Sequence, residues 1–180
     1  MTLITVAGRS ALLTRDAEAE AIDGGAIVNK LLGDADTTDG AVSANRALMR
    51  PDAAGPPPHF HKTAAEIFFV LDGAVEALAG DQLVTIERND FLVVPAGMPH
   101  TFAPAPGGSA DVLVLFAPGM NERFEYFRLA NRVMRGEASP QEIFDSQERF
   151  DNYFVQSDVW TRGQFTGPTT SQTSGPARPR

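Results

Sequence analysis

Three histidines and one glutamate are spaced so that they could bind a metal ion. His59 and His61 are two residues apart, so an extended strand would place both imidazoles on one face. Glu66 precedes an apolar run at residues 67–70, where a carboxylate needs either solvent or a partner. His100 follows a Pro- and Gly-rich turn that could bring a later strand beside the first pair. Together these side chains suit one divalent transition metal: Fe, Mn, Ni, Co, Cu or Zn.

The segments that would position these residues are short and β-like. Between residues 40 and 117, runs of β-branched and aromatic residues alternate with Gly, Pro and Asp, which is typical of a sandwich or barrel. We expect strands at residues 26–32, 41–49, 67–71, 74–78, 83–87, 91–94 and 112–116. Turn signals at Asp72-Gly73 and Gly80-Asp81 predict a meander in the middle of this stretch.

The chain changes character after residue 118. Apolar residues at helical spacing predict a helix over residues 121–134. Ser139 followed by Pro140 and Glu142 combines a capping box with proline at the first helical position, which predicts a second, shorter helix. We therefore expect N-terminal strands and an arm at 1–39, a barrel core at 40–117, a helical extension at 118–160 and a disordered tail at 161–180.

Composition restricts the partners. The 180 residues fit one domain, and their net charge of -8 disfavours nucleic acid and anionic membrane surfaces. The absence of cysteine removes disulfides, thiolate metal sites and cysteine nucleophiles. No apolar stretch approaches the roughly 18 residues of a membrane span, and we see no secretion signal. We expect a cytoplasmic protein that binds a small molecule.

The candidate ligand residues also lie in two segments that resemble the signature motifs of the cupin superfamily. The first segment reads His59-x-His61, four residues, Glu66, six residues, Gly73, and the second reads Pro95-x-Gly97, two residues, His100. The sequence departs from the usual motifs outside the ligand positions, at Ala53, Asn89 and Pro104. The resemblance implies an all-β fold, a single double-stranded β-helix or jelly-roll barrel, here followed by two C-terminal α-helices.

Within the superfamily, the chain is most similar to small single-domain bacterial cupins of the quercetin 2,3-dioxygenase-like group. This resemblance implies a dioxygenase that acts on a small aromatic or flavonol-like compound, with Glu66 as both metal ligand and acceptor of the substrate hydroxyl proton. Two alternatives stay open, because a cupin fold does not name a reaction. One is a metal-dependent isomerase, cyclase or lyase of polyketide-type secondary metabolism, and the other is a small-molecule-binding protein without catalytic activity.

Strand parity selects residues for a substrate pocket. If Glu66 and His100 point into the barrel, Phe68 and Phe102 do so as well. On the strand at 41–49, Asn45 and Met49 would share the inner face. We expect Asn45, Met49, Phe68 and Phe102 to contact substrate, with ordinary barrel filling as the alternative for the three apolar residues.

The opposite face of the strand that begins near Glu66 carries three large apolar residues. Ile67, Phe69 and Leu71 would point away from the lumen, where exposure to water is unfavourable. Either the C-terminal helices or a partner subunit would have to cover them. Because cupins are commonly dimers, we expect a homodimer with this strand at or near the interface.

Overall fold

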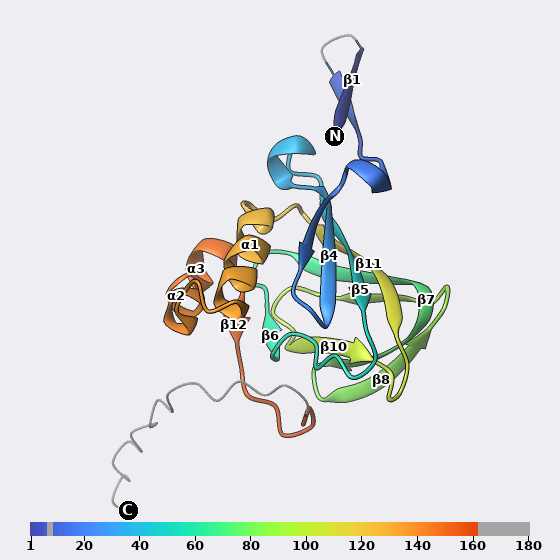
Figure 1. Ribbon diagram of the computed structural model, residues 1–180, viewed down its shortest axis with the longest axis vertical. Coiled ribbons are helices and arrows are strands. Elements are labelled where there is room, and N and C mark those ends of the chain that lie inside the picture. Colours follow the sequence, from blue (N-terminus) through green and yellow to red (C-terminus); the bar gives the residue numbers. More distant parts are fainter. Residues whose placement is uncertain (7–8, 162–180) are drawn as a thin grey trace, which may run out of the picture.

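The computed structural model describes residues 1–6 and 9–161, which form one barrel with a helical extension (Figure 1). The strands are β1 Thr2–Val6, β2 Arg9–Leu13, β3 Glu20–Asp23, β4 Ile27–Gly33, β5 Ser43–Met49, β6 His59–Phe60, β7 Ala65–Ala79, β8 Gln82–Glu87, β9 Phe91–Val94, β10 His100–Pro104, β11 Ala110–Ala117 and β12 Tyr153–Phe154. The helices are α1 Arg123–Met134, α2 Pro140–Asp145 and α3 Gln147–Phe150, with short 3-10 helices at Asp16–Glu18 and Ala35–Thr37. From residue 162 onward, the predicted tail lies outside the described residues.

The barrel is built from antiparallel strands in the order β12-β6-β10-β7-β11-β5-β4-β3, with β8 and β9 each pairing with β7. The long strand β7 joins the two halves of the sheet, because one half of it pairs with β11 and β9 and the other with β10 and β8. The hairpin β1-β2 projects away from the barrel, whereas the C-terminal helices lie against its side (Figure 1). The predicted all-β barrel with C-terminal helices is confirmed.

One predicted turn is wrong. Asp72-Gly73 does not reverse the chain, and β7 runs through it as a single strand. The register against β11 shifts between Asp111 and Val112, so β7 bends at a bulge and passes from one half of the sheet to the other. Gly73 allows the bend because it has φ +74 and because a Cβ there would lie 2.1 Å from the Ser109 carbonyl oxygen.

The helical extension also differs from expectation. It contains three helices instead of two, since Ser146 ends α2 and the short α3 begins directly after it. The predicted capping box is present, with Ser139 accepting a hydrogen bond from Gln141 and Glu142 accepting one from the Ser139 backbone N–H. None of the described helices is long and apolar enough to cross a membrane.

One hydrophobic cluster fills the barrel, and a smaller one joins α1 to it. The main core fills the lumen with alternate residues of β5, β7 and β11, whose inner side chains are buried. The smaller cluster joins Phe124 and Phe127 of α1 to Ile22 of β3 and Leu31 of β4. Helix α1 therefore packs at the β3-β4 end of the sheet.

Candidate metal centre

The four residues predicted to bind metal come together inside the barrel. His59 opens β6 and pairs with His100, which opens β10, while His61 follows β6 and Glu66 lies on the adjacent β7. Their candidate ligand atoms all lie within 4.8 Å of one another. Glu66 Oε2 is 2.6 Å from His100 Nε2 and 2.9 Å from His61 Nε2. It is 3.8 Å from His59 Nε2.

The outer nitrogens of the three imidazoles orient the rings. Each Nδ1–H donates to a backbone carbonyl: His59 to Pro57 at 2.8 Å, His61 to Asp151 at 2.6 Å and His100 to Met98 at 2.9 Å. A carbonyl only accepts, so these bonds place the proton of a neutral imidazole on Nδ1 and the lone pair on Nε2. Metal-binding histidines are commonly oriented in this way.

This arrangement fits a cation. Three Nε2 lone pairs and one carboxylate converge in a site where all four residues are at most 3% exposed. Without a metal ion between them, or a proton on one of the Nε2 atoms, these acceptors would repel one another in a poorly solvated space. His59, His61, Glu66 and His100 could therefore hold one divalent transition metal, whose identity the donor set leaves open among Fe, Mn, Ni, Co, Cu and Zn.

The pKa values of the candidate ligands show the same need for a positive charge among them. Burial, reinforced by repulsion from His100, lowers the pKa of His59 to about 3. Burial would raise the pKa of Glu66, but the charge and hydrogen bond of His100 and the contacts with the other two imidazoles hold it well below its usual value. Burial would also lower the pKa of His100, and the Glu66 carboxylate outweighs it and raises that pKa. Glu66 is thus maintained as an anion.

Asp151 is a positioning residue that the sequence did not reveal. It follows α3 in a left-handed conformation, φ 47, and its carbonyl accepts the bond from His61. Its carboxylate accepts hydrogen bonds from the Lys62 and Thr63 backbone N–H groups at 2.8 and 2.9 Å and from the Thr63 hydroxyl. The helical extension therefore holds the segment that carries His61.

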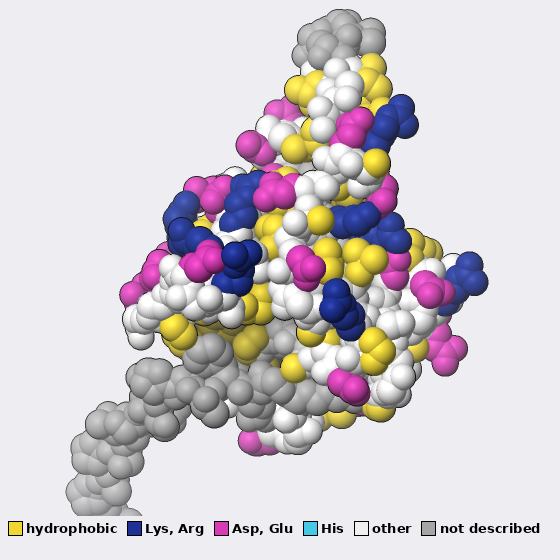
Figure 2. All heavy atoms as spheres, viewed as in Figure 1, with side chains coloured by type: hydrophobic (Ala, Val, Ile, Leu, Met, Phe, Trp, Pro, Cys, Tyr) yellow, Lys and Arg dark blue, Asp and Glu magenta, His cyan; other side chains and the backbone are white. Residues whose placement is uncertain are grey.

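A cavity of about 420 Å³ lies between the barrel and the helices, and His59 and Glu66 line it. In Figure 2, hydrophobic side chains gather beneath the helical extension, where this hollow lies. Asn45 and Phe102, two of the four residues expected to contact substrate, also line it. Met49 and Phe68 do not, because both are buried in the barrel core, where the Phe68 ring packs edge-on against Phe102 at 4.9 Å.

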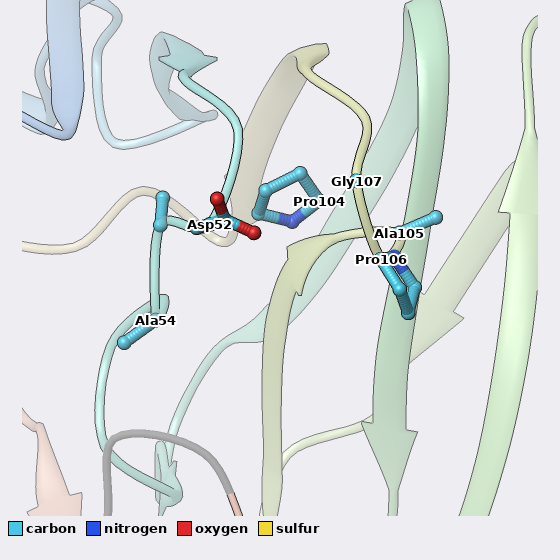
Figure 3. Close-up of a pocket in the computed structure, with 7 residues that line it drawn as sticks. Asp52, Ala54, Pro104, Ala105, Pro106 and Gly107 are labelled. Atoms are coloured by element: carbon cyan, nitrogen blue, oxygen red, sulfur yellow. The ribbon is translucent and has the colours of Figure 1, made fainter.

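One face of α1 forms the opposite wall of the cavity. Arg123 lines it together with Tyr126, Phe127 and Ala130, which follow it by three, four and seven residues and so share one helix face. The sequence identified the helix but did not identify Arg123 or Asn152 as cavity residues, because their partners lie far away along the chain. A second hollow of about 290 Å³ lies between residues 52–54 and 104–107 (Figure 3), with Asp52 as its one ionisable side chain, and it lies apart from the metal ligands.

Comparison with known families agrees with this geometry. Residues 45–116 match the model of the family described as cupin domain, a segment that contains all four candidate ligands. Over this segment the chain is similar to cupin domains. A search of curated proteins gave no match.

Solved structures resemble this chain in fold. An RmlC-like cupin from Shewanella frigidimarina NCIMB 400 is 21% identical, with a TM-score of 0.52 over 62% of this chain and 93% of that one. KdgF from Halomonas sp. is 21% identical, with a TM-score of 0.50 over 58% of this chain and 90% of that one. Streptomyces PAC13 with uridine is 18% identical, with a TM-score of 0.52 over 64% of this chain and 88% of that one. At these identities the likeness is one of fold.

Proposed function

We propose that this protein is a metal-dependent cupin dioxygenase that acts on a small aromatic or flavonol-like compound. The observation that supports the proposal is the buried cluster of three histidines and Glu66, which meets an apolar cavity through His59 and Glu66. A cavity of about 420 Å³ falls within the range of small-molecule sites.

The protein's own side chains have distinct roles in this proposal. A bound transition metal would supply Lewis acidity and redox chemistry. Glu66 is held as an anion at the edge of the cavity and would accept the proton of a substrate hydroxyl. Phe102, Val114 and Phe116 line the same space and would hold an aromatic ring while excluding water.

The test combines metal content with oxygen dependence. The full chain would be analysed for bound metal and assayed on a panel of flavonols and smaller phenols, in air and under anaerobic conditions. We expect about one metal ion per chain and turnover that stops without oxygen. Substrate turnover that continues unchanged under anaerobic conditions would contradict a dioxygenase.

A metal-dependent isomerase, cyclase or lyase is the second candidate. It is favoured by the juxtaposition of an anionic base, Glu66, with a buried cation, Arg123, on the walls of one cavity. Such a pair can remove a proton and stabilise the charge that develops, without oxygen. Streptomyces PAC13 is described as a nucleoside dehydratase, so a protein of this fold performs chemistry of that kind. The anaerobic assay separates the two candidates, and metal and ligand binding without turnover would indicate a binding protein.

A further inference from the structure

Arg123 is a buried cation without a matching anion. It is the first residue of α1, it is 4% exposed, and its side chain lines the cavity. Within residues 1–6 and 9–161, no carboxylate forms an ion pair with its guanidinium. The Asp34 carboxylate at the start of the helix accepts the Arg123 and Phe124 backbone N–H groups instead.

The guanidinium is held in place mainly by aromatic rings. Its central carbon lies 4.3 Å from the centroid of Phe116, 4.4 Å from that of Tyr126 and 5.0 Å from that of Phe127. One N–H donates to Asn152 Oδ1 at 3.3 Å, and Nε–H has no hydrogen-bond partner in the described structure. Aromatic faces orient a guanidinium but leave its hydrogen-bonding edge available.

Two asparagine side chains that line the same cavity each have one polar atom without a hydrogen-bond partner in the described structure. Asn152 accepts from Arg123, but its Nδ2 has no partner, and Asn45 donates to Asn29 Oδ1 at 3.0 Å while its own Oδ1 has none. Asn45 and Asn152 are each 2% exposed. Buried polar atoms normally have partners, so the two donors among the described residues, Arg123 Nε–H and Asn152 Nδ2–H, indicate that a bound molecule supplies an acceptor. Asn45 Oδ1 needs a donor instead, which a carboxylate does not supply.

These contacts define the ligand's chemistry. A planar guanidinium pairs best with an oxyanion that accepts two hydrogen bonds, and a carboxylate matches its single charge. A phosphate dianion would need further cations, and Arg123 is the only Lys or Arg among the described residues that line the cavity. The remaining wall is largely apolar, including Ile22, Ile27, Val114 and Phe116. An apolar body with one carboxylate fits this environment.

Arg123 also lies within reach of the metal ligands. Phe116 contacts both, since its ring centroid lies 5.4 Å from that of His61 and 4.3 Å from the central carbon of the Arg123 guanidinium. A ligand bound to Arg123 by one end would share the cavity with His59 and Glu66, which also line it.

We propose that Arg123, assisted by Asn152, is the residue that selects the ligand, and that the ligand is a small aromatic monocarboxylate. The inference rests on the proposed function only in using the same cavity, and it specifies the substrate class. Arg123 fixes the carboxylate and so sets which part of the molecule faces Glu66.

The test measures binding instead of turnover. The full chain, metal-free and loaded with redox-inert Zn²⁺, would be titrated with 2-naphthoate and cinnamate and with their neutral primary amides. We expect each acid to bind about tenfold or more tightly than its amide, as a charge-assisted hydrogen-bonded pair allows. Equal affinity for acid and amide in the wild-type protein would overturn the proposal.

Variants assign the preference to Arg123. Arg123→Met keeps an apolar side chain of similar length, and we expect it to lose the preference for the acids while still binding the amides. Arg132→Met is the matched control, because Arg132 lies on the same helix with an exposed side chain, and it should behave as wild type. If Arg123→Met does not fold, as judged by circular dichroism, Arg123→Lys keeps the charge without the planar fork and should bind the acids more weakly. An undiminished preference in a folded Arg123 variant would contradict the assignment.

The outcomes for this inference and for the proposed function are separate. Acid binding that depends on Arg123, without oxygen-dependent turnover, supports the inference and counts against the dioxygenase. Oxygen-dependent turnover of neutral phenols, with no preference for acids over amides, supports the dioxygenase and overturns the inference.

Discussion

At the scale of single residues, Glu66 combines the roles of ligand and base, and two substitutions separate them. Glu66→Gln keeps a carbonyl oxygen near the three imidazoles but cannot take a proton. We expect turnover to fall by a much larger factor than metal occupancy, measured by steady-state assay and elemental analysis on the same samples. Equal losses would argue against a role as base.

His61→Ala is the companion variant at this scale. It removes one of the four candidate ligands, and it also leaves the Asp151 carbonyl without the bond from Nδ1. We expect metal and activity to disappear together while the protein keeps most of its stability, because the barrel core is apolar and does not include this side chain. Thermal unfolding monitored by circular dichroism measures the stability. Full metal occupancy in this variant would contradict the site.

At the scale of elements, the helical extension stabilises the metal site from outside the barrel. Asp151 connects α3 to the segment at residues 61–63 through four hydrogen bonds. Asp151→Gly removes the carboxylate and suits the left-handed backbone, so we expect it to fold and to bind Zn²⁺ or Co²⁺ about 10- to 100-fold more weakly. Competition with a chelator measures the affinity. Asp145→Ala, which alters an exposed carboxylate on α2, should leave it unchanged, and an unaltered affinity in Asp151→Gly would contradict the positioning role.

At the scale of the whole molecule, the described residues of one chain do not completely cover the outer face of β7. Ile67 and Phe69 pair with Val93 and Phe91 of β9, and these two are 46% and 62% exposed. Helix α1 packs on β3 and β4 at the other end of that half of the sheet. Burying each such side chain would contribute about 1.5–3 kcal/mol, so we propose a homodimer through this face.

Sedimentation tests the dimer. The wild-type chain should sediment as a dimer at micromolar concentration, and Phe69→Asp should give monomer or aggregate. Leu83→Asp is the matched control, since Leu83 is an exposed apolar residue on β8, in the other half of the barrel, and its substitution should leave the dimer intact. A wild-type monomer would show that the face needs no partner.

The sequence by itself determined a β-rich class, most strand positions and the four candidate ligands, and the resemblance to the cupin motifs selected a barrel over a sandwich. These features depend on local information: the alternation of apolar residues, the turn residues, the capping box at Ser139, and a complement of only three histidines placed in two motifs. The same local reasoning failed at Asp72-Gly73, because a turn signal and a bulge share their residues and only the pairing of β7 with β11 separates them.

Tertiary structure alone decided what surrounds the ligands. The Asp151 carbonyl reaches His61 across 90 residues of sequence, and Arg123 and Asn152 meet Asn45 at a cavity that no spacing encodes. It also separated Phe102, which lines the cavity, from Phe68 behind it, although strand parity gave both the same direction. Parity sets the face on which a side chain lies, whereas its depth below a cavity depends on how the helices pack over the barrel.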